Sequence, residues 1–174
     1  MRQRNNKIFT LILCALLCAL SIVLTRWATI NLGFIHLGFG NLPVVLAGVL
    51  LGGGPGFAVG AVADMVGGIL AGYAINPLIT LGAALIGGVA GWLWRLLPGK
   101  NETVRLALAL LAAHLLGSTI VNSLALHIFY GYPWVTLAAR VPNMLAQVAM
   151  EVVVLRLLLN NTAFRRAVGE RFFS

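Results

Sequence analysis

Three charged side chains stand out in this sequence because each lies within or beside a long apolar stretch: Arg26, Asp64 and Arg140. A carboxylate in the middle of a membrane span costs at least about 2.5 kcal/mol, so Asp64 must be neutral, pair with a donor or face a wet cavity. The planar guanidinium of arginine binds carboxylates through two parallel hydrogen bonds. A carboxylate can accept two donors from an amino-pyrimidine edge. These side chains therefore favour a ligand with acid groups at one end and a nitrogen-rich ring at the other.

Two further sets of polar side chains recur at helical spacing, so each set shares one face of an expected helix. The first set is His114, Ser118 and Asn122, and the second is Arg140, Asn143, Gln147 and Glu151. The second set extends from Arg140 to Glu151, which lies about 16 Å deeper at a helical rise of 1.5 Å per residue. We expect the members of these sets to serve two purposes: some form a buried hydrogen-bond cluster between helices, and others form a ligand site together with Asp64. The expected cluster comprises His114, Gln147 and Glu151, and the expected ligand site includes Asp64, Arg140 and Asn143. The remaining members are Ser118 and Asn122.

Aromatic side chains gather in alternate loops between the apolar stretches, where a flat heterocycle could stack on them. An aromatic belt at the membrane interface is the alternative interpretation for any single Trp or Tyr. The predicted ligand-binding residues are Arg26, Trp27, His36, Phe39, Asn41, Asp64, Tyr73, Asn76, Asn122, Tyr130, Trp134, Arg140 and Asn143.

The composition requires a membrane to position these residues. Hydrophobic residues make up 60% of the 174 residues and charged residues 9%. A soluble domain of this size cannot hide so much apolar surface. A helix needs about 20 residues to cross the hydrocarbon, so the length allows about six crossings with short loops. We expect an all-α integral membrane protein, one domain over residues 1–174, forming a compact bundle of six transmembrane helices. The expected helices cover about 8–27, 41–51, 57–72, 77–97, 104–129 and 138–159.

Glycine marks both breaks and close packing in this plan. The segment 28–40 is too polar and Gly-rich for a simple span, and the cluster 52–56 is a strong helix breaker. Small residues four apart let helices approach closely in lipid. They recur at Gly52, Gly56, Gly60, Gly68 and Gly72, with Asp64 in the missing position, and at Ala83, Gly87 and Gly91.

The positive charges predict an orientation. Ten of the twelve Lys and Arg residues fall at the termini or in alternate loops on one side, and only Arg26 and Arg140 fall on the other. The positive-inside bias makes the first side cytoplasmic and places both termini there. The basic residues then lie beside anionic lipid, and no nucleic-acid partner is expected.

Catalytic and metal-binding motifs are missing from the sequence. No Gly-Lys-Ser/Thr follows the glycine cluster, so the chain cannot hydrolyse ATP itself, and energised transport needs a partner. Cys14 and Cys18 have neither zinc-site nor disulfide-framework spacing, so we expect no metal and no cofactor. A small intramembrane enzyme using His114 with Glu151 or Asp64 remains a remote alternative.

Three segments resemble the substrate-binding (S) components of energy-coupling-factor (ECF) vitamin transporters, with the strongest similarity to the folate-specific members. The resemblance covers nearly the whole chain. It is carried by Leu37-Gly-Phe-Gly-Asn-Leu-Pro-Val-Val-Leu-Ala-Gly-Val-Leu-Leu-Gly, by Gly60-Ala-Val-Ala-Asp-Met-Val-Gly, and by the segment from Tyr130-Gly to Arg140-Val-Pro-Asn143.

The resemblance implies a non-enzymatic subunit of an importer in the bacterial plasma membrane. Such proteins bind a vitamin, here folate, from outside in a pocket closed by loops one, three and five. Another vitamin or a pterin-like compound is the alternative ligand. They dock on a transmembrane coupling subunit driven by two cytoplasmic ATPase subunits. An Ala-x-x-x-Ala motif serves docking, and Ala15 and Ala19 stand at its place. The Gly- and Pro-rich third loop of the family is replaced here by Tyr73-Ala-Ile-Asn-Pro77.

Overall fold

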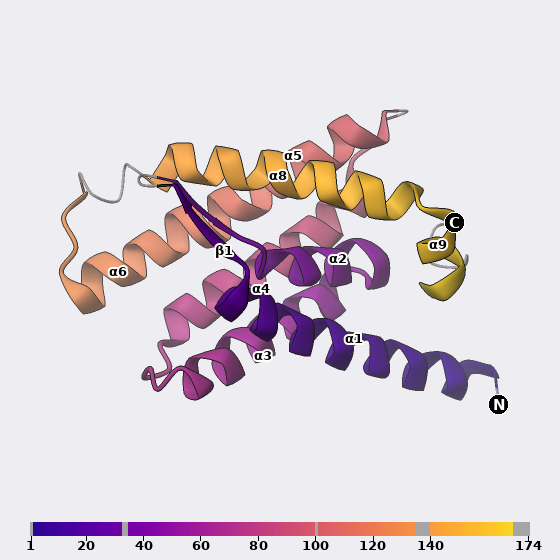
Figure 1. The fold of residues 1–174 in the computed structure, drawn as a ribbon, viewed down its shortest axis with the longest axis horizontal. Coiled ribbons are helices and arrows are strands. Elements are labelled where there is room, and N and C mark those ends of the chain that lie inside the picture. The colour runs from indigo at the N-terminus through magenta and orange to yellow at the C-terminus, as the bar shows by residue number, and fades with distance from the viewer. Residues whose placement is uncertain (1, 33–34, 100, 135–139, 169–174) are drawn as a thin grey trace.

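The computed structural model describes residues 2–32, 35–99, 101–134 and 140–168, and its helices form a bundle with one β-hairpin (Figure 1). The first half contains α1 (Arg2–Trp27), β1 (Thr29–Leu32), β2 (Ile35–Gly38), α2 (Asn41–Leu51), α3 (Gly53–Leu70) and α4 (Pro77–Leu96). The second half contains α5 (Glu102–His114), the π-helical segment η1 (Leu115–Val121), α6 (Asn122–Tyr130), α8 (Arg140–Asn160) and α9 (Thr162–Val168).

Five stretches of the described chain are long and apolar enough to cross a membrane: residues 7–27, 53–70, 77–96, 102–130 and 140–160. The helical membrane bundle expected from the sequence therefore has five spans of full length. The remaining expected span, the second in chain order, is α2, which has only 11 residues. At 1.5 Å per residue it covers about 16 Å, roughly half of the hydrocarbon thickness.

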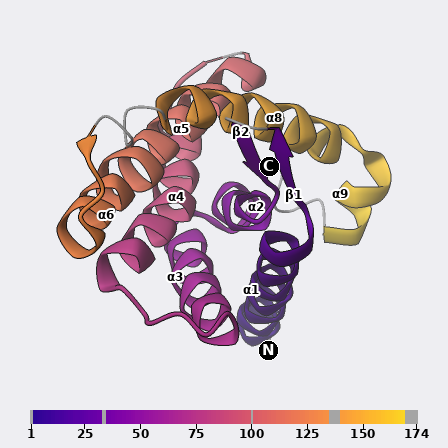
Figure 2. The same ribbon diagram turned by 60° about the vertical axis from the view of Figure 1, so that its left-hand side comes forward.

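Helix α2 lies in the middle of the bundle, with α1, α3, α4, α5 and α8 around it (Figure 2). Every residue from Leu42 to Leu51 is buried. A helix that is apolar on all faces belongs in a core, because no side of it needs water. Its short length and complete burial identify α2 as the core element of the fold.

Residues 28–40, expected to form a loop because they are too polar for a simple span, contain a β-hairpin. Strands β1 and β2 pair antiparallel, with Thr29 opposite Gly38 and Leu32 opposite Ile35. The all-α prediction omitted this hairpin. Its base is closed by the Phe39 amide, which donates to the Ala28 carbonyl at 3.2 Å, and by the Ser21 hydroxyl, which donates to the Gly40 carbonyl at 2.7 Å.

The expected close packing through glycine is confirmed for Gly56, Gly60, Gly87 and Gly91, where an added Cβ would overlap the backbone of a neighbouring helix. It is wrong for Gly68 and Gly72, where a Cβ would meet nothing within 4 Å. A Cβ atom at Gly48 would overlap the Gly87 carbonyl, and one at Gly60 would overlap the Ala83 carbonyl. The break at the glycine cluster is shorter than expected. Only Gly52, with φ of 105°, separates α2 from α3, and α3 begins at Gly53 rather than near residue 57. Pro55 is accommodated because it lies in the first turn of α3, where no N–H is needed.

The two ends of the bundle differ in what they hold. The start of α1 and the whole of α9 lie at one end of the bundle, on the right in Figure 1. The hairpin, the turn between α3 and α4, and the end of α6 lie at the opposite end. We call this second end the hairpin end. Basic side chains occupy the elements that reach the first end: Arg95 in the last turn of α4, Arg105 near the start of α5, and Arg165 in α9.

Candidate ligand-binding site

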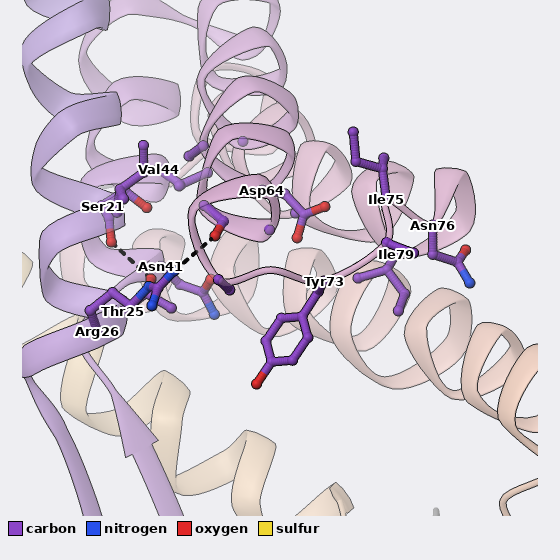
Figure 3. A pocket seen from close by; sticks show the side chains of 18 of the residues that line it. Ser21, Thr25, Arg26, Asn41, Val44, Asp64, Tyr73, Ile75, Asn76 and Ile79 are labelled. Carbon is purple, nitrogen blue, oxygen red and sulfur yellow. Dashed lines mark hydrogen bonds between the residues drawn. The ribbon is translucent and has the colours of Figure 1, made fainter.

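A cavity with a volume of about 530 Å³, called the larger cavity below, is formed by the described residues. It lies at the hairpin end, between the last turns of α1 and α3, the start of α4 and the end of α6 (Figure 3). Its volume falls within the range of about 300–1,000 Å³ typical of small-molecule sites. Its polar lining residues are Ser21, Thr25, Arg26, Asn41, Asp64, Tyr73, Asn76 and Tyr130.

Asp64 supplies the carboxylate of the larger cavity. Its Oδ2 accepts a hydrogen bond from the Thr80 hydroxyl at 2.6 Å. Neither the His114–Glu151 nor the Arg156–Glu102 ion pair involves Asp64. A carboxylate has about four acceptor sites, so Asp64 retains capacity for donors from a ligand.

The rim of the larger cavity is formed by the C-terminal turn of α1 and the turn that precedes α4. The exposed Arg26 donates from Nη2 to the Gly67 carbonyl at 3.4 Å. The Asn76 side chain caps α4 by accepting from the Leu78 amide at 3.0 Å. The exposed ring of Tyr73 lies beside this turn (Figure 3). The rim therefore offers a cation and an aromatic face to a ligand that enters from the hairpin end.

The smaller cavity, of about 240 Å³, lies between the hairpin, the start of α2, the α5–η1 junction and α8. It is lined by Gly38, Asn41, His114, Ser118, Arg140, Asn143, Met144 and Gln147. Within the described residues, Nη1 of Arg140 is buried and has no hydrogen-bond partner. Arg140 as a whole is half-buried, and this nitrogen is available to a further hydrogen-bond acceptor in the smaller cavity.

Buried hydrogen bonds through Glu151 connect His114 and Gln147, two of the residues that line the smaller cavity. The Glu151 carboxylate contacts His114 Nε2 at 2.8 Å and accepts from Gln147 Nε2 at 2.7 Å. His114 is 1% exposed and Glu151 is 0% exposed. Gln147 also hydrogen-bonds to the backbone of Gly38. The interpretation of these three side chains as a buried interhelical cluster is confirmed.

The structure divides the predicted ligand-binding residues between the two cavities rather than gathering them at one. Arg140 and Asp64 do not line a common cavity, and among the predicted residues whose side chains the structure describes, Asn41 alone lines both. The larger cavity contains Arg26, Asn41, Asp64, Tyr73, Asn76 and Tyr130, and the smaller contains Asn41, Arg140 and Asn143. Trp27, Phe39, Asn122 and Trp134 line neither, and the side chain of His36 lies outside the described part of the structure.

Three of the four residues that line neither cavity have other surroundings. Trp27, at the end of α1, is 89% exposed, and Trp134 packs on the ring of His127 with centroids 4.4 Å apart. Phe39 packs against the apolar core. His36 lies in β2 opposite Asn31. The structure thus places the rings of Trp27 and Trp134 at the bundle surface and the ring of Phe39 against its core.

Asn122 is displaced from the face of His114 and Ser118 by the π-helical segment. Hydrogen bonds in a π-helix join residues five apart, so Asn122 shares a face with Gly117, and both meet Gly82 of α4. Asn122 instead packs on α4, where its Oδ1 atom occupies the space that a Cβ at Gly82 would need. The spacing of residues in the sequence could not reveal this, because the sequence of the π-helical segment, residues 115–121, does not differ visibly from that of an ordinary apolar α-helix.

Sequence reasoning missed the hydroxyl side chains around the larger cavity. Ser21 and Thr25 line it from α1, and Thr80 supplies the donor to Asp64. Four-residue spacing of Ser21 and Thr25 at the end of the first apolar stretch is the signal that could have found them. Thr80 carried no comparable signal, because its distance from Asp64 depends on how α3 packs against α4.

Ala15 and Ala19, the expected docking residues, lie exposed on α1. The surrounding surface of α1 is also apolar and exposed, including Leu11 and Leu16. The first helix therefore presents a continuous apolar face that includes both small residues.

An apolar helical bundle with polar cavities at one end defines a multi-pass membrane protein that binds a small polar ligand. The sequence model of the ECF-type riboflavin transporter S component family matches residues 5–163, and the chain belongs to this family. As a transporter S component it is not an enzyme. The resemblance to ECF S components found in the sequence is confirmed.

Solved structures support the same assignment. The chain is similar to the crystal structure of FolT bound with folic acid, with 28% identity, a TM-score of 0.67, and coverage of 85% of this chain and 90% of that chain. It also shares the fold of an S component of a bacterial ECF transporter, with 21% identity, a TM-score of 0.65, and coverage of 88% and 94%. A search of curated proteins finds no match.

Proposed function

We propose that this protein is the substrate-specificity subunit of an ATP-driven vitamin importer and that its ligand is folate. The similarity to FolT supports folate, and the family description supports riboflavin as the second candidate. Both vitamins carry a flat nitrogen-rich ring system. They differ in charge, because folate has carboxylates whereas riboflavin is neutral.

The observation that favours folate is the buried Nη1 of Arg140, which has no hydrogen-bond partner within the described residues. A carboxylate of folate would supply the charged acceptor that this guanidinium lacks, in the bidentate geometry that Arg favours. Asn143 lines the same cavity one helical turn away and adds a polar side chain. Riboflavin offers no such charge.

The larger cavity would accept the ring of the vitamin. Asp64 has acceptor capacity for an amino-pyrimidine edge, and Tyr73 and Tyr130 offer aromatic faces. Asn41 lines both cavities, and we infer that one elongated ligand occupies both, with its ring near Asp64 and its acid group at Arg140.

The hairpin end would face the outside of a bacterial cell. The basic elements at the opposite end fit the cytoplasmic side by the positive-inside bias, with both termini there. In this arrangement α2 completes a six-helix transmembrane plan from inside the bundle. The exposed Ala15 and Ala19 would contact the transmembrane coupling subunit, which two cytoplasmic ATPase subunits drive.

Isothermal titration calorimetry on the purified protein tests the proposal with folate and riboflavin as separate ligands. Wild type should bind folate, and Arg140→Ala and Asp64→Asn should each weaken binding tenfold or more, equivalent to about 1.4 kcal/mol. Arg166→Ala, an exposed arginine of α9, is the matched control and should leave the affinity unchanged. Binding of riboflavin without binding of folate would replace the first candidate by the second.

A further inference from the structure

Gln147 connects α8 to the hairpin through two hydrogen bonds to a single residue. Its Nε2 donates to the Gly38 carbonyl at 2.6 Å, and its Oε1 accepts from the Gly38 amide at 3.1 Å. A two-stranded sheet leaves edge N–H and C=O groups without a strand partner. Gln147 pairs both groups of Gly38, the last residue of β2, much as a neighbouring strand would.

Glu151 determines which way the Gln147 amide points. The amide must present oxygen to the Gly38 N–H and nitrogen to the Gly38 carbonyl, and a flipped amide would lose both bonds. Gln147 and Glu151 lie four residues apart on one face of α8, and Glu151 Oε1 accepts from the same Nε2 at 2.7 Å. Glu151 Oε2 is in turn 2.8 Å from His114 Nε2 of α5.

We propose that Gln147 is a positioning residue that fixes β2 as a wall of the smaller cavity, and that Glu151 acts through it by orienting its amide. Gly38 and Gln147 both line this cavity together with Arg140. Without the two bonds, β2 would keep its pairing with β1 and the attachments that follow it at Phe39 and Gly40, but it would lose these hydrogen bonds to α8. The cavity wall would then open more often, and a bound ligand would dissociate faster. This last consequence rests on the proposed function.

Hydrogen exchange of the ligand-free full-length protein tests the connection itself. Peptides that contain Gly38 should exchange faster in Gln147→Met, because the backbone N–H of Gly38 loses its acceptor. They should also exchange faster in Glu151→Met, because the side-chain amide of Gln147 is then free to flip. Met keeps the approximate length of both side chains, which limits cavity formation. Unchanged exchange at Gly38 in Gln147→Met, with the fold intact by thermal unfolding, would overturn the inference.

Glu151→Gln separates orientation from charge. An amide at position 151 can accept from Gln147 and donate to Nε2 of a neutral His114, so the exchange of Gly38 should return toward the wild-type rate. A general loss of stability would not be rescued in this selective way. Gly38→Ala is the matched control on the hairpin, because a Cβ there meets nothing within 4 Å and both backbone groups remain. Its exchange should equal that of wild type.

Ligand dissociation then tests the functional consequence. The folate dissociation rate constant should rise about fivefold in Gln147→Met and Glu151→Met, the effect of about one net hydrogen bond, and much less in Glu151→Gln. Faster exchange without faster dissociation would overturn the functional part of the inference. Failure of wild type to bind folate would reject the proposed ligand, whereas the exchange measurements would still decide the role of Gln147.

Discussion

Replacing Arg140 by Met should have opposite effects on ligand affinity and on the stability of the ligand-free protein. Met fills a similar part of the smaller cavity but has neither charge nor donors. Removing one partner of a buried, hydrogen-bonded charge pair typically costs about 2–5 kcal/mol. At the lower limit, the folate dissociation constant should rise about 30-fold. The folate dissociation constant of Arg140→Lys should lie between those of wild type and Arg140→Met, because an ammonium retains the charge but not the planar bidentate geometry.

The ligand-free protein should become more stable in the same variant. Nη1 of Arg140 is buried without a hydrogen-bond partner among the described residues. A buried polar group in this state costs about 1–3 kcal/mol, more when it is charged, and Met removes that cost. The midpoint of thermal unfolding should therefore rise without ligand, while the further rise on adding folate should shrink.

Calorimetry and thermal unfolding of Arg140→Met, with Arg166→Met as the control for loss of one positive charge, test both signs together. Wild-type folate affinity in Arg140→Met would refute the ligand-site assignment. A lower unfolding midpoint without ligand would refute the argument that the guanidinium is poorly compensated in the ligand-free fold.

Three further predictions follow from the packing, the larger cavity and the exposed face of α1. Gly48→Ala should destabilise the fold by about 1–3 kcal/mol in thermal or denaturant unfolding, because its Cβ would overlap the α4 backbone, whereas Gly68→Ala, with open space around its Cβ, should not. Thr80→Val should lower folate affinity about fivefold in calorimetry through loss of the donor that orients the Asp64 carboxylate. Ala19→Trp should leave folate binding intact but prevent co-purification with the coupling subunit, whereas Trp at the exposed Ala58 of α3 should not; equal co-purification would reject the docking face.

The helical bundle was predictable because hydropathy and the spacing of small residues are local properties of the sequence. The contacts of Gly56, Gly60, Gly87 and Gly91 agree with the four-residue repeat. The length of α2 was visible too, but its role as a buried centre was not. A short apolar run can be a poor span or a core helix, and only packing by the surrounding helices decides between them.

The site was less predictable because it depends on distances between elements. The shared face of Gln147 and Glu151 follows from their spacing, and the structure confirms their hydrogen bond. Arg140 and Asp64 were expected at one mouth, but hydropathy contains no information on which cavity each would line. Asn122 was assigned to the face of His114 because the spacing argument assumed a regular α-helix, and the π-helical segment removes that assumption.

The most direct test of the central claim is an experimental structure of the protein with folate bound. We expect a folate carboxylate to accept hydrogen bonds from the Arg140 guanidinium at about 2.7–2.9 Å, with the ring system on the side of Asp64. Folate bound elsewhere, or bound at the hairpin end without contact to Arg140, would contradict the account.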